Sequence, residues 1–363
     1  MTVAVDTDLA LKLRGVSKQY PGTDAAAVSG VDLDIRRGEF VTFLGPSGSG
    51  KTTTLNMIAG FISPTGGQIL LDGKDIADLP PHRRNLGMVF QNYALFPHMS
   101  VWDNVAFPLV ERKYPKEQIR ERVRAALEMV NLTGFEKRRP RELSGGQQQR
   151  VALTRALVFD PPILLMDEPL SALDKKLRQR LQLEIKRVHR EVGITFLFVT
   201  HDQEEAMALS DRVVVFDHGR IEQVGTPDEL YRRPATRFVA EFLGDSNLID
   251  GRLVTSDGTV ALEAPEGRIP LAGPPAPSDG EHCVMFRPED VRVTSGEDDA
   301  AAWKGTVREV VYLGSERRVI VTTETGRDVT ARTSGETTGV PRVGDAVGLR
   351  FSASNAWLIP TTG

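Results

Sequence analysis

Short apolar runs and longer amphipathic segments alternate along the first two thirds of the chain. EFVTFL (39–44), ILLM (163–166) and FLFVT (196–200) have the length of buried strands. Between them, residues 117–130 carry apolar side chains at helical spacing, with charges on the opposite face. The apolar stripe consists of Ile119, Val123, Ala126, Leu127 and Val130. This alternation predicts a layered α/β domain over residues 9–243.

The pattern changes after residue 243. Residues 270–280 (PLAGPPAPSDG) are rich in proline and glycine, and residues 305–323 alternate apolar and polar positions as a β-hairpin does. Residues 247–363 are therefore expected to form a small all-β barrel. Within the first domain, residues of about 92–158 are expected to form a helical subdomain.

Composition narrows the class of protein. The 363 residues are 40% hydrophobic and 26% charged, as in ordinary globular proteins, and the formal net charge of -4 argues against a nucleic-acid partner. Cys283 is the single cysteine, so no intramolecular disulfide can form and a packing role is expected. Residues 1–15 lack an export signal, and no apolar run reaches the ~20 residues of a membrane span. Any link to a membrane is expected to come through another protein.

A complete phosphate-binding motif follows the first apolar run. Residues 45–52 (GPSGSGKT) match the pattern G-x-x-x-x-G-K-[ST], and the next residues continue as a helix. The glycines let successive backbone N–H groups face the β- and γ-phosphates, and Lys51 adds a positive charge. The Thr52 hydroxyl is a candidate Mg²⁺ ligand. Because the flanking strand and helix agree with the motif, it predicts a P-loop NTPase fold.

Polar side chains also follow three other strand-like runs. Asp167 and Glu168 follow ILLM, His201 follows FLFVT, and Gln91 follows MVF. Ligands bind at the carboxyl edge of parallel sheets, so these side chains are expected near the phosphate loop. Asp167 would hold Mg²⁺ through water, and Glu168 would polarise the attacking water. His201 would contact the γ-phosphate or the water, and Gln91 would reach Mg²⁺ or the water.

Two further features concern a nucleotide. In LSGGQQQR (143–150), Ser144 and the two glycines after it stand at a helix start, where free N–H groups form an anion site. Tyr20, in the turn-rich segment SKQYPG, is placed either to stack on a purine base or simply to pack. The chain thus has two phosphate-binding helix starts but only one set of carboxylates.

Taken in order, these motifs resemble those of the nucleotide-binding ATPase subunit of an ABC transporter, and none departs from that family's pattern. The resemblance identifies an A-loop at Tyr20, Walker A at residues 45–52, a Q-loop at Gln91, the signature LSGGQ, Walker B at ILLMDE, a D-loop ending at Asp174 and a switch histidine at His201.

The resemblance implies a head-to-tail homodimer that binds ATP and Mg²⁺. ATP would lie between Walker A of one subunit and the signature of the other, which explains two phosphate sites and one carboxylate set per chain. Glu168, His201 and Gln91 would then be catalytic, and Thr52, Gln91 and Asp167 would serve the metal. The nucleotide-binding residues would be Tyr20, Gly45, Ser47, Gly48, Ser49, Gly50, Lys51, Thr52, Thr53, Ser144, Gly145, Gly146, Gln147 and Asp174.

Further partners are implied by the same resemblance. The helical subdomain would dock on transmembrane permease subunits, which also meet a substrate-binding protein, and this chain would lie peripherally at the cytoplasmic face of the cell membrane. Residues 80–109 and RPEDVRV (287–293) resemble importer ATPases that carry a TOBE-type β-domain, and EFLGDSNLI (241–249) favours polyamines as cargo. Ferric iron, sulfate or sugar import, or a mainly regulatory ATPase, are the alternatives.

Other ATPases of the superfamily fit less well. A DNA-repair or chromosome ATPase needs a long coiled coil between Walker A and the signature, but Ser144 follows Lys51 by only 93 residues. A translation-associated ATPase normally carries two such cassettes, whereas this sequence has one.

Overall fold

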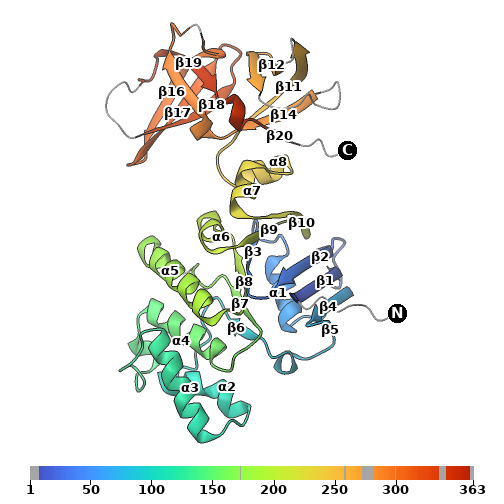
Figure 1. Ribbon diagram of the computed structural model, residues 1–363, viewed down its shortest axis with the longest axis vertical. Coiled ribbons are helices and arrows are strands. Elements are labelled where there is room, and N and C mark those ends of the chain that lie inside the picture. The colour runs from blue at the N-terminus through green and yellow to red at the C-terminus, as the bar shows by residue number, and fades with distance from the viewer. Residues whose placement is uncertain are drawn as a thin grey trace. The chain divides into compact units, whose positions relative to one another are not determined.

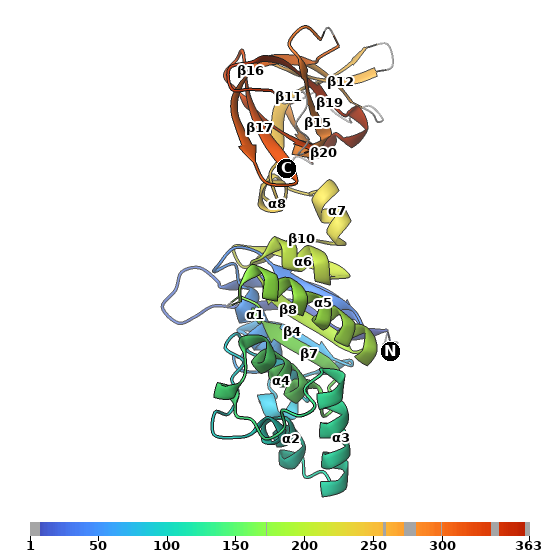
Figure 2. The same cartoon turned by 90° about the vertical axis from the view of Figure 1, so that its left-hand side faces the viewer.

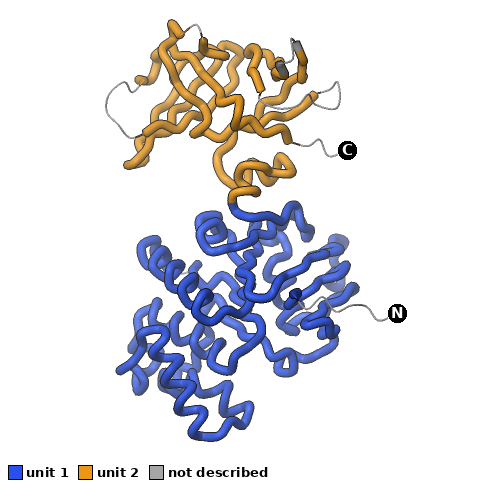
Figure 3. The backbone as a smooth tube through the Cα atoms, viewed as in Figure 1, with its two compact units in different colours: residues 1–227 blue, residues 228–363 orange. Residues whose placement is uncertain are grey.

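The structure is a computed structural model that describes residues 8–171, 173–256, 259–271, 281–298, 300–334 and 341–359. The chain divides into two compact units, residues 1–227 and residues 228–363, which Figure 3 colours separately. Most of the segment expected to be turn-rich, residues 270–280, lies outside the described residues.

A six-stranded sheet forms the centre of the first unit (Figure 1). Its strands follow the order β10 (Arg220–Gly225), β9 (Arg212–Asp217), β3 (Phe40–Leu44), β8 (Thr195–Thr200), β7 (Ile163–Asp167) and β6 (Gly87–Val89). All neighbours are parallel except β10, which pairs antiparallel with β9. Every residue of β3 and β8 is buried, which explains their continuous apolar sequences. The carboxyl ends of β3, β8, β7 and β6 meet at one edge.

The first unit also contains a smaller antiparallel sheet and helix α1 (Lys51–Ala59), which follows the phosphate loop. The sheet has the order β2 (Val28–Arg36), β1 (Leu9–Lys18), β4 (Gly66–Leu71) and β5 (Lys74–Asp75). Leu55, Met57 and Ile58 of α1 are fully buried in a core that they share with both sheets. This packing holds the helix that follows the phosphate loop against the central sheet.

Residues 92–158 contain three helices, α2 (Val101–Glu111), α3 (Lys116–Met129) and α4 (Gly145–Leu157), which Figures 1 and 2 show grouped together. The 3-10 helices η1 (Pro81–Arg83) and η2 (Pro140–Glu142) lie in the connections. Val123, Ala126 and Leu127 are the buried residues of α3, so the amphipathic helix predicted there is confirmed.

Two more helices of the first unit follow strands of the central sheet. These are α5 (Lys175–Val192) after β7 and α6 (Gln203–Leu209) after β8. Buried residues of α2, α3, α4 and α5 share one core with Phe196 and Phe198 of β8. No helix in the described part of the chain is both long and apolar enough to cross a membrane.

The second unit contains two curled antiparallel sheets, and residues of both contribute to one hydrophobic core. One has the order β13 (Gly267–Leu271), β12 (Thr259–Ala264), β11 (Asn247–Ser256), β14 (Glu281–Phe286) and β20 (Trp357–Ile359). The other has the order β15 (Val291–Ser295), β19 (Ala346–Phe351), β16 (Trp303–Tyr312), β17 (Glu316–Thr323) and β18 (Asp328–Ser334). β16 and β17 form the hairpin predicted at residues 305–323. The predicted fold class, an α/β domain followed by an all-β domain, is confirmed.

Helices α7 (Pro227–Arg232) and α8 (Arg237–Phe242) fall almost entirely in the second unit, although residues up to 243 were expected in the first domain. Arg287 explains this division, because its guanidinium donates to the carbonyl oxygens of Tyr231 (3.0 Å) and Ala240 (3.1 Å). The Tyr231 hydroxyl donates to Glu289 at 2.8 Å. The 3-10 helices η3 (Pro288–Asp290) and η4 (Ala353–Asn355) complete this unit.

The thiol of Cys283, in β14, is expected to be chemically inert near neutral pH. Burial raises its pKa from 9.0 to about 11, and only the thiolate is nucleophilic. At pH 8 the folded protein should react with iodoacetamide roughly 100-fold more slowly than a thiol with the ordinary pKa. Reactivity should then rise as the pH approaches 11. Mass spectrometry against the urea-unfolded chain measures this difference, and equal rates would contradict the burial of this thiol.

Candidate active site

The phosphate loop has the backbone geometry that its glycines predict. Gly48 and Gly50 adopt left-handed φ angles of +82° and +100°, where a side chain is strained. A Cβ atom at Gly45 would lie 2.2 Å from the carbonyl oxygen of Phe216, at the end of β9. The loop therefore needs glycine at these positions for two reasons, backbone conformation and close approach.

Replacing Gly45 by alanine should move the loop away from β9 and weaken ATP binding. We expect roughly 100-fold lower affinity, which is about 2.8 kcal/mol. Titration with a fluorescent ATP analogue measures it. Gly66→Ala is the matched control, because a Cβ there meets nothing within 4 Å and the backbone needs no left-handed φ. Unchanged affinity in Gly45→Ala would refute the steric argument.

Lys51 is held within the loop that it follows. Its side chain is largely enclosed, with the residue only 5% exposed, and Nζ donates to the carbonyl oxygens of Gly45 and Pro46, both at 2.8 Å. Burial lowers the pKa of Lys51, while the nearby carboxylates of Glu168 and Asp167 raise it. Anionic oxygens would be stronger acceptors for the Lys51 ammonium group than these two carbonyl oxygens, and would replace them when an anion binds.

Thr52 and Asp167 meet at the carboxyl edge of the sheet. The Thr52 hydroxyl donates to Asp167 Oδ1 at 3.0 Å, across 115 residues of sequence. Burial raises the pKa of Asp167, the Thr52 hydrogen bond opposes that shift, and the Glu168 charge adds to it. A hydroxyl and a carboxylate side by side supply the hard oxygen donors that Mg²⁺ prefers.

Glu168 and His201 form a second pair at the same edge. His201 Nδ1 lies 3.2 Å from Glu168 Oε1, and the His201 side chain is half exposed. The backbone of Glu168 is left-handed, with φ +42°, and its N–H donates to the carbonyl oxygen of Val199 in β8. The turn after β7 thus places the Glu168 carboxylate beside His201.

Gln91 is linked to Glu168 through Ser171, a residue that sequence reasoning missed as part of the site. Its side-chain amide donates to the Ser171 hydroxyl at 3.2 Å, and that hydroxyl donates to the carbonyl oxygen of Glu168 at 3.0 Å. The serine of SALD was visible as part of the D-loop motif, but its contact with Gln91 spans 80 residues. Arg178 was also missed, and its guanidinium donates to the carbonyl oxygen of Leu173 and to the carboxylate of Asp202, the residue after His201.

The signature residues lie on a different element, at the start of α4. Ser144 is the N-cap, and its N–H and hydroxyl form a reciprocal pair with the Gln147 side chain and N–H. A Cβ at Gly146 would lie 3.2 Å from Leu177 of α5. The N–H groups of Gly145 and Gly146 are in the first helical turn and have no acceptor within the described ranges.

The other predicted nucleotide residues lie on several elements of the first unit. Tyr20 follows β1 and is 38% exposed, with Lys18 Nζ 5.4 Å from its ring centroid. Ser47 is exposed, Ser49 is buried and Thr53 is half-buried. Asp174 caps α5 by accepting from the N–H of Leu177, which positions the D-loop end. No hydrogen bond between described residues joins Tyr20 or the signature to the phosphate loop.

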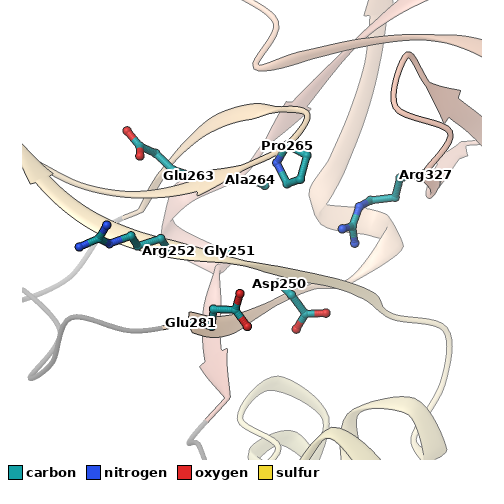
Figure 4. Close-up of a pocket in the computed structure, with 8 residues that line it drawn as sticks. All are labelled: Asp250, Gly251, Arg252, Glu263, Ala264, Pro265, Glu281 and Arg327. Carbon is teal, nitrogen blue, oxygen red and sulfur yellow. The ribbon is translucent and has the colours of Figure 1, made fainter.

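A depression in the described part of the second unit has a different character. It measures about 690 Å³ and is lined by mixed charges, which Figure 4 shows. Asp250 is paired with Arg237, and Arg327 with Glu266 at 2.6 Å. Its lining carries three carboxylates, of Asp250, Glu263 and Glu281, against the two arginines Arg252 and Arg327, a charge balance that does not favour a phosphate.

Comparisons with known proteins agree with this geometry. A family model described as ABC transporter matches residues 28–171, and one described as TOBE domain matches residues 284–359. The spermidine/putrescine import ATP-binding protein PotA of Acidothermus cellulolyticus is 52% identical over 93% of this chain and 91% of its own. The protein of the same name from Thermobifida fusca is 49% identical over 97% of this chain and 94% of its own. A dimeric post-hydrolysis structure of the cassette MJ0796 with ADP and Pi is 36% identical, with TM-score 0.53, over 60% of this chain and 98% of that one.

The fold and the phosphate edge together define an ATP-hydrolysing cassette. The chain belongs to the family of ABC transporter ATP-binding proteins, and it carries a TOBE domain.

Proposed function

We propose that this ATPase drives the import of polyamines. The observation that carries the proposal is similarity over almost the whole length, both units included, to proteins named for spermidine and putrescine import. The protein would work at the cytoplasmic face of the cell membrane, bound to permease subunits that receive the cargo from a substrate-binding protein.

In the proposed site, Lys51 and the loop amides bind the β- and γ-phosphates of ATP. Thr52 and Asp167, whose oxygens are already 3.0 Å apart, would hold Mg²⁺ with help from Gln91. The ion would neutralise charge on the phosphate oxygens. Tyr20, exposed beyond the end of β1, would stack on the adenine ring.

Glu168 is the proposed general base. A carboxylate 3.2 Å from His201 is positioned to accept a proton from a water attacking the γ-phosphate, while His201 orients that water or the phosphate. Phosphoryl transfer depends mainly on positioning and charge stabilisation, which is why a fixed turn after β7 suits this residue.

Each nucleotide would be completed by a second copy of the chain. The unpartnered N–H groups of Gly145 and Gly146, with the Ser144 hydroxyl and Gln147, would contact the γ-phosphate held by the partner subunit. Asp174 would lie at the same interface. ATP then favours the closed dimer because only that state makes both sets of contacts, and hydrolysis releases it.

Uptake by cells tests the cargo. In a strain that lacks this chain, we expect uptake of labelled spermidine and putrescine to fall, and the intact protein to restore it. The inactive Glu168→Gln protein should not restore it. Ferric iron, sulfate and maltose are measured in parallel, and loss of one of these with normal polyamine uptake would overturn the polyamine assignment.

A further inference from the structure

Arg155 lies at the far end of the signature helix from Ser144. It is on the last turn of α4 and is only 9% exposed. No carboxylate of the described residues forms a salt bridge with Arg155, and burial lowers its pKa. A buried guanidinium without a counter-charge is costly unless its donors are well used.

The Arg155 guanidinium forms hydrogen bonds with the backbone just after Gln91. Arg155 Nη2 donates to the carbonyl oxygen of Tyr93 at 3.0 Å, and Nη1 donates to that of Ala94 at 2.9 Å. The guanidinium also lies 5.3 Å from the ring centroid of Phe96. One planar side chain therefore holds two successive carbonyl groups of the loop, a geometry that lysine cannot reproduce.

The backbone held in this way is strained. Tyr93 and Ala94 are consecutive non-glycine residues with left-handed φ angles of +61° and +45°. Such angles are unfavourable for residues with a Cβ and persist where the surroundings impose them. Asn104 of α2 holds the next part of the loop, accepting from the N–H of Phe96 at 2.9 Å and donating to its carbonyl at 3.1 Å.

We propose that Arg155 is a positioning residue that fixes the loop carrying Gln91 to the helix carrying Ser144. This inference rests on the proposed roles of those two residues. A helix is stiff, so a displacement of the loop at one end of α4 moves the signature at the other end. The state of one nucleotide, read by Gln91, would in this way reach the signature that completes the partner subunit's site.

Arg155→Lys in the full-length protein tests the proposal. Lysine keeps the charge but cannot donate to both carbonyl groups, so we expect kcat for ATP to fall roughly tenfold while KM changes less than about threefold. Arg150→Lys is the matched control, because Arg150 is on the same helix and its 2.7 Å ion pair with Glu184 can be kept by lysine. It should leave turnover within about twofold.

Hydrogen exchange separates positioning from general loosening. In Arg155→Lys, exchange should rise in both residues 91–98 and residues 143–148, while residues 45–52 stay as protected as in the unchanged protein. Unchanged kcat, faster exchange near Gln91 alone, or a loosened phosphate loop with raised KM would each overturn the proposal.

A rescue variant guards against simple misfolding. Ala94→Gly adopts the left-handed backbone without strain, so adding it to Arg155→Lys should restore part of the lost turnover. If the double variant regained no turnover, the proposed role of Arg155 in holding the loop would be contradicted. All readouts use ATP turnover or exchange, so a protein that hydrolyses ATP but imports no polyamine would refute the proposed cargo and leave this inference standing.

Discussion

Replacing Glu168 by glutamine is expected to lower ATP turnover by roughly 100-fold or more, because a general base contributes about that factor. Glutamine has nearly the same size and still fits beside His201, so ATP binding should persist. With hydrolysis blocked, ATP should hold two copies together, and the protein should elute as a dimer that contains unhydrolysed nucleotide. Phosphate release and size-exclusion chromatography with light scattering measure both effects.

Glu191→Gln is the control for that experiment. Glu191 is an exposed residue of α5 paired with Arg187, and it lies outside the phosphate edge. Its variant should hydrolyse ATP normally. Normal turnover in Glu168→Gln would remove the assignment of Glu168 as general base.

A mixture of two inactive variants should regain activity. Lys51→Ala removes the positive charge from the phosphate loop, and Ser144→Arg fills the signature's helix start with a large side chain. Each homodimer then has two defective composite sites, whereas a head-to-tail heterodimer has one intact site. When equal amounts are mixed, about half of the dimers are heterodimers, and each of these has one intact site out of two. We therefore expect roughly a quarter of the activity of the unchanged protein.

Purified heterodimers sharpen this result. Two different affinity tags isolate them, and turnover per heterodimer should approach roughly half that of the unchanged dimer. Stable heterodimers without any turnover would argue against sites shared between subunits.

The central strands of the six-stranded sheet were predictable because they are buried on both faces. β3 and β8 are buried at every position, so their sequences read as continuous apolar runs. The place of α7 and α8 was not predictable from local pattern. Their attachment depends on Arg287, which contacts Tyr231 across 56 residues and Ala240 across 47.

The same distinction separates the predicted and missed residues of the site. Lys51 and Thr52 belong to one octapeptide with fixed spacing, so a motif alone locates them. Ser171 contacts Gln91, which is 80 residues away in sequence. Arg155 contacts Ala94, which is 61 residues away. No local periodicity marks such contacts, because they arise only when the elements pack.

The proposal that two copies of the chain enclose each nucleotide is tested most directly by a structure of the Glu168→Gln protein with ATP and Mg²⁺. We expect the Ser144 hydroxyl and the Gly146 N–H of each subunit within hydrogen-bond distance of the γ-phosphate bound by the other subunit. A closed, ATP-loaded dimer in which these groups lie far from the neighbouring triphosphate would contradict the account.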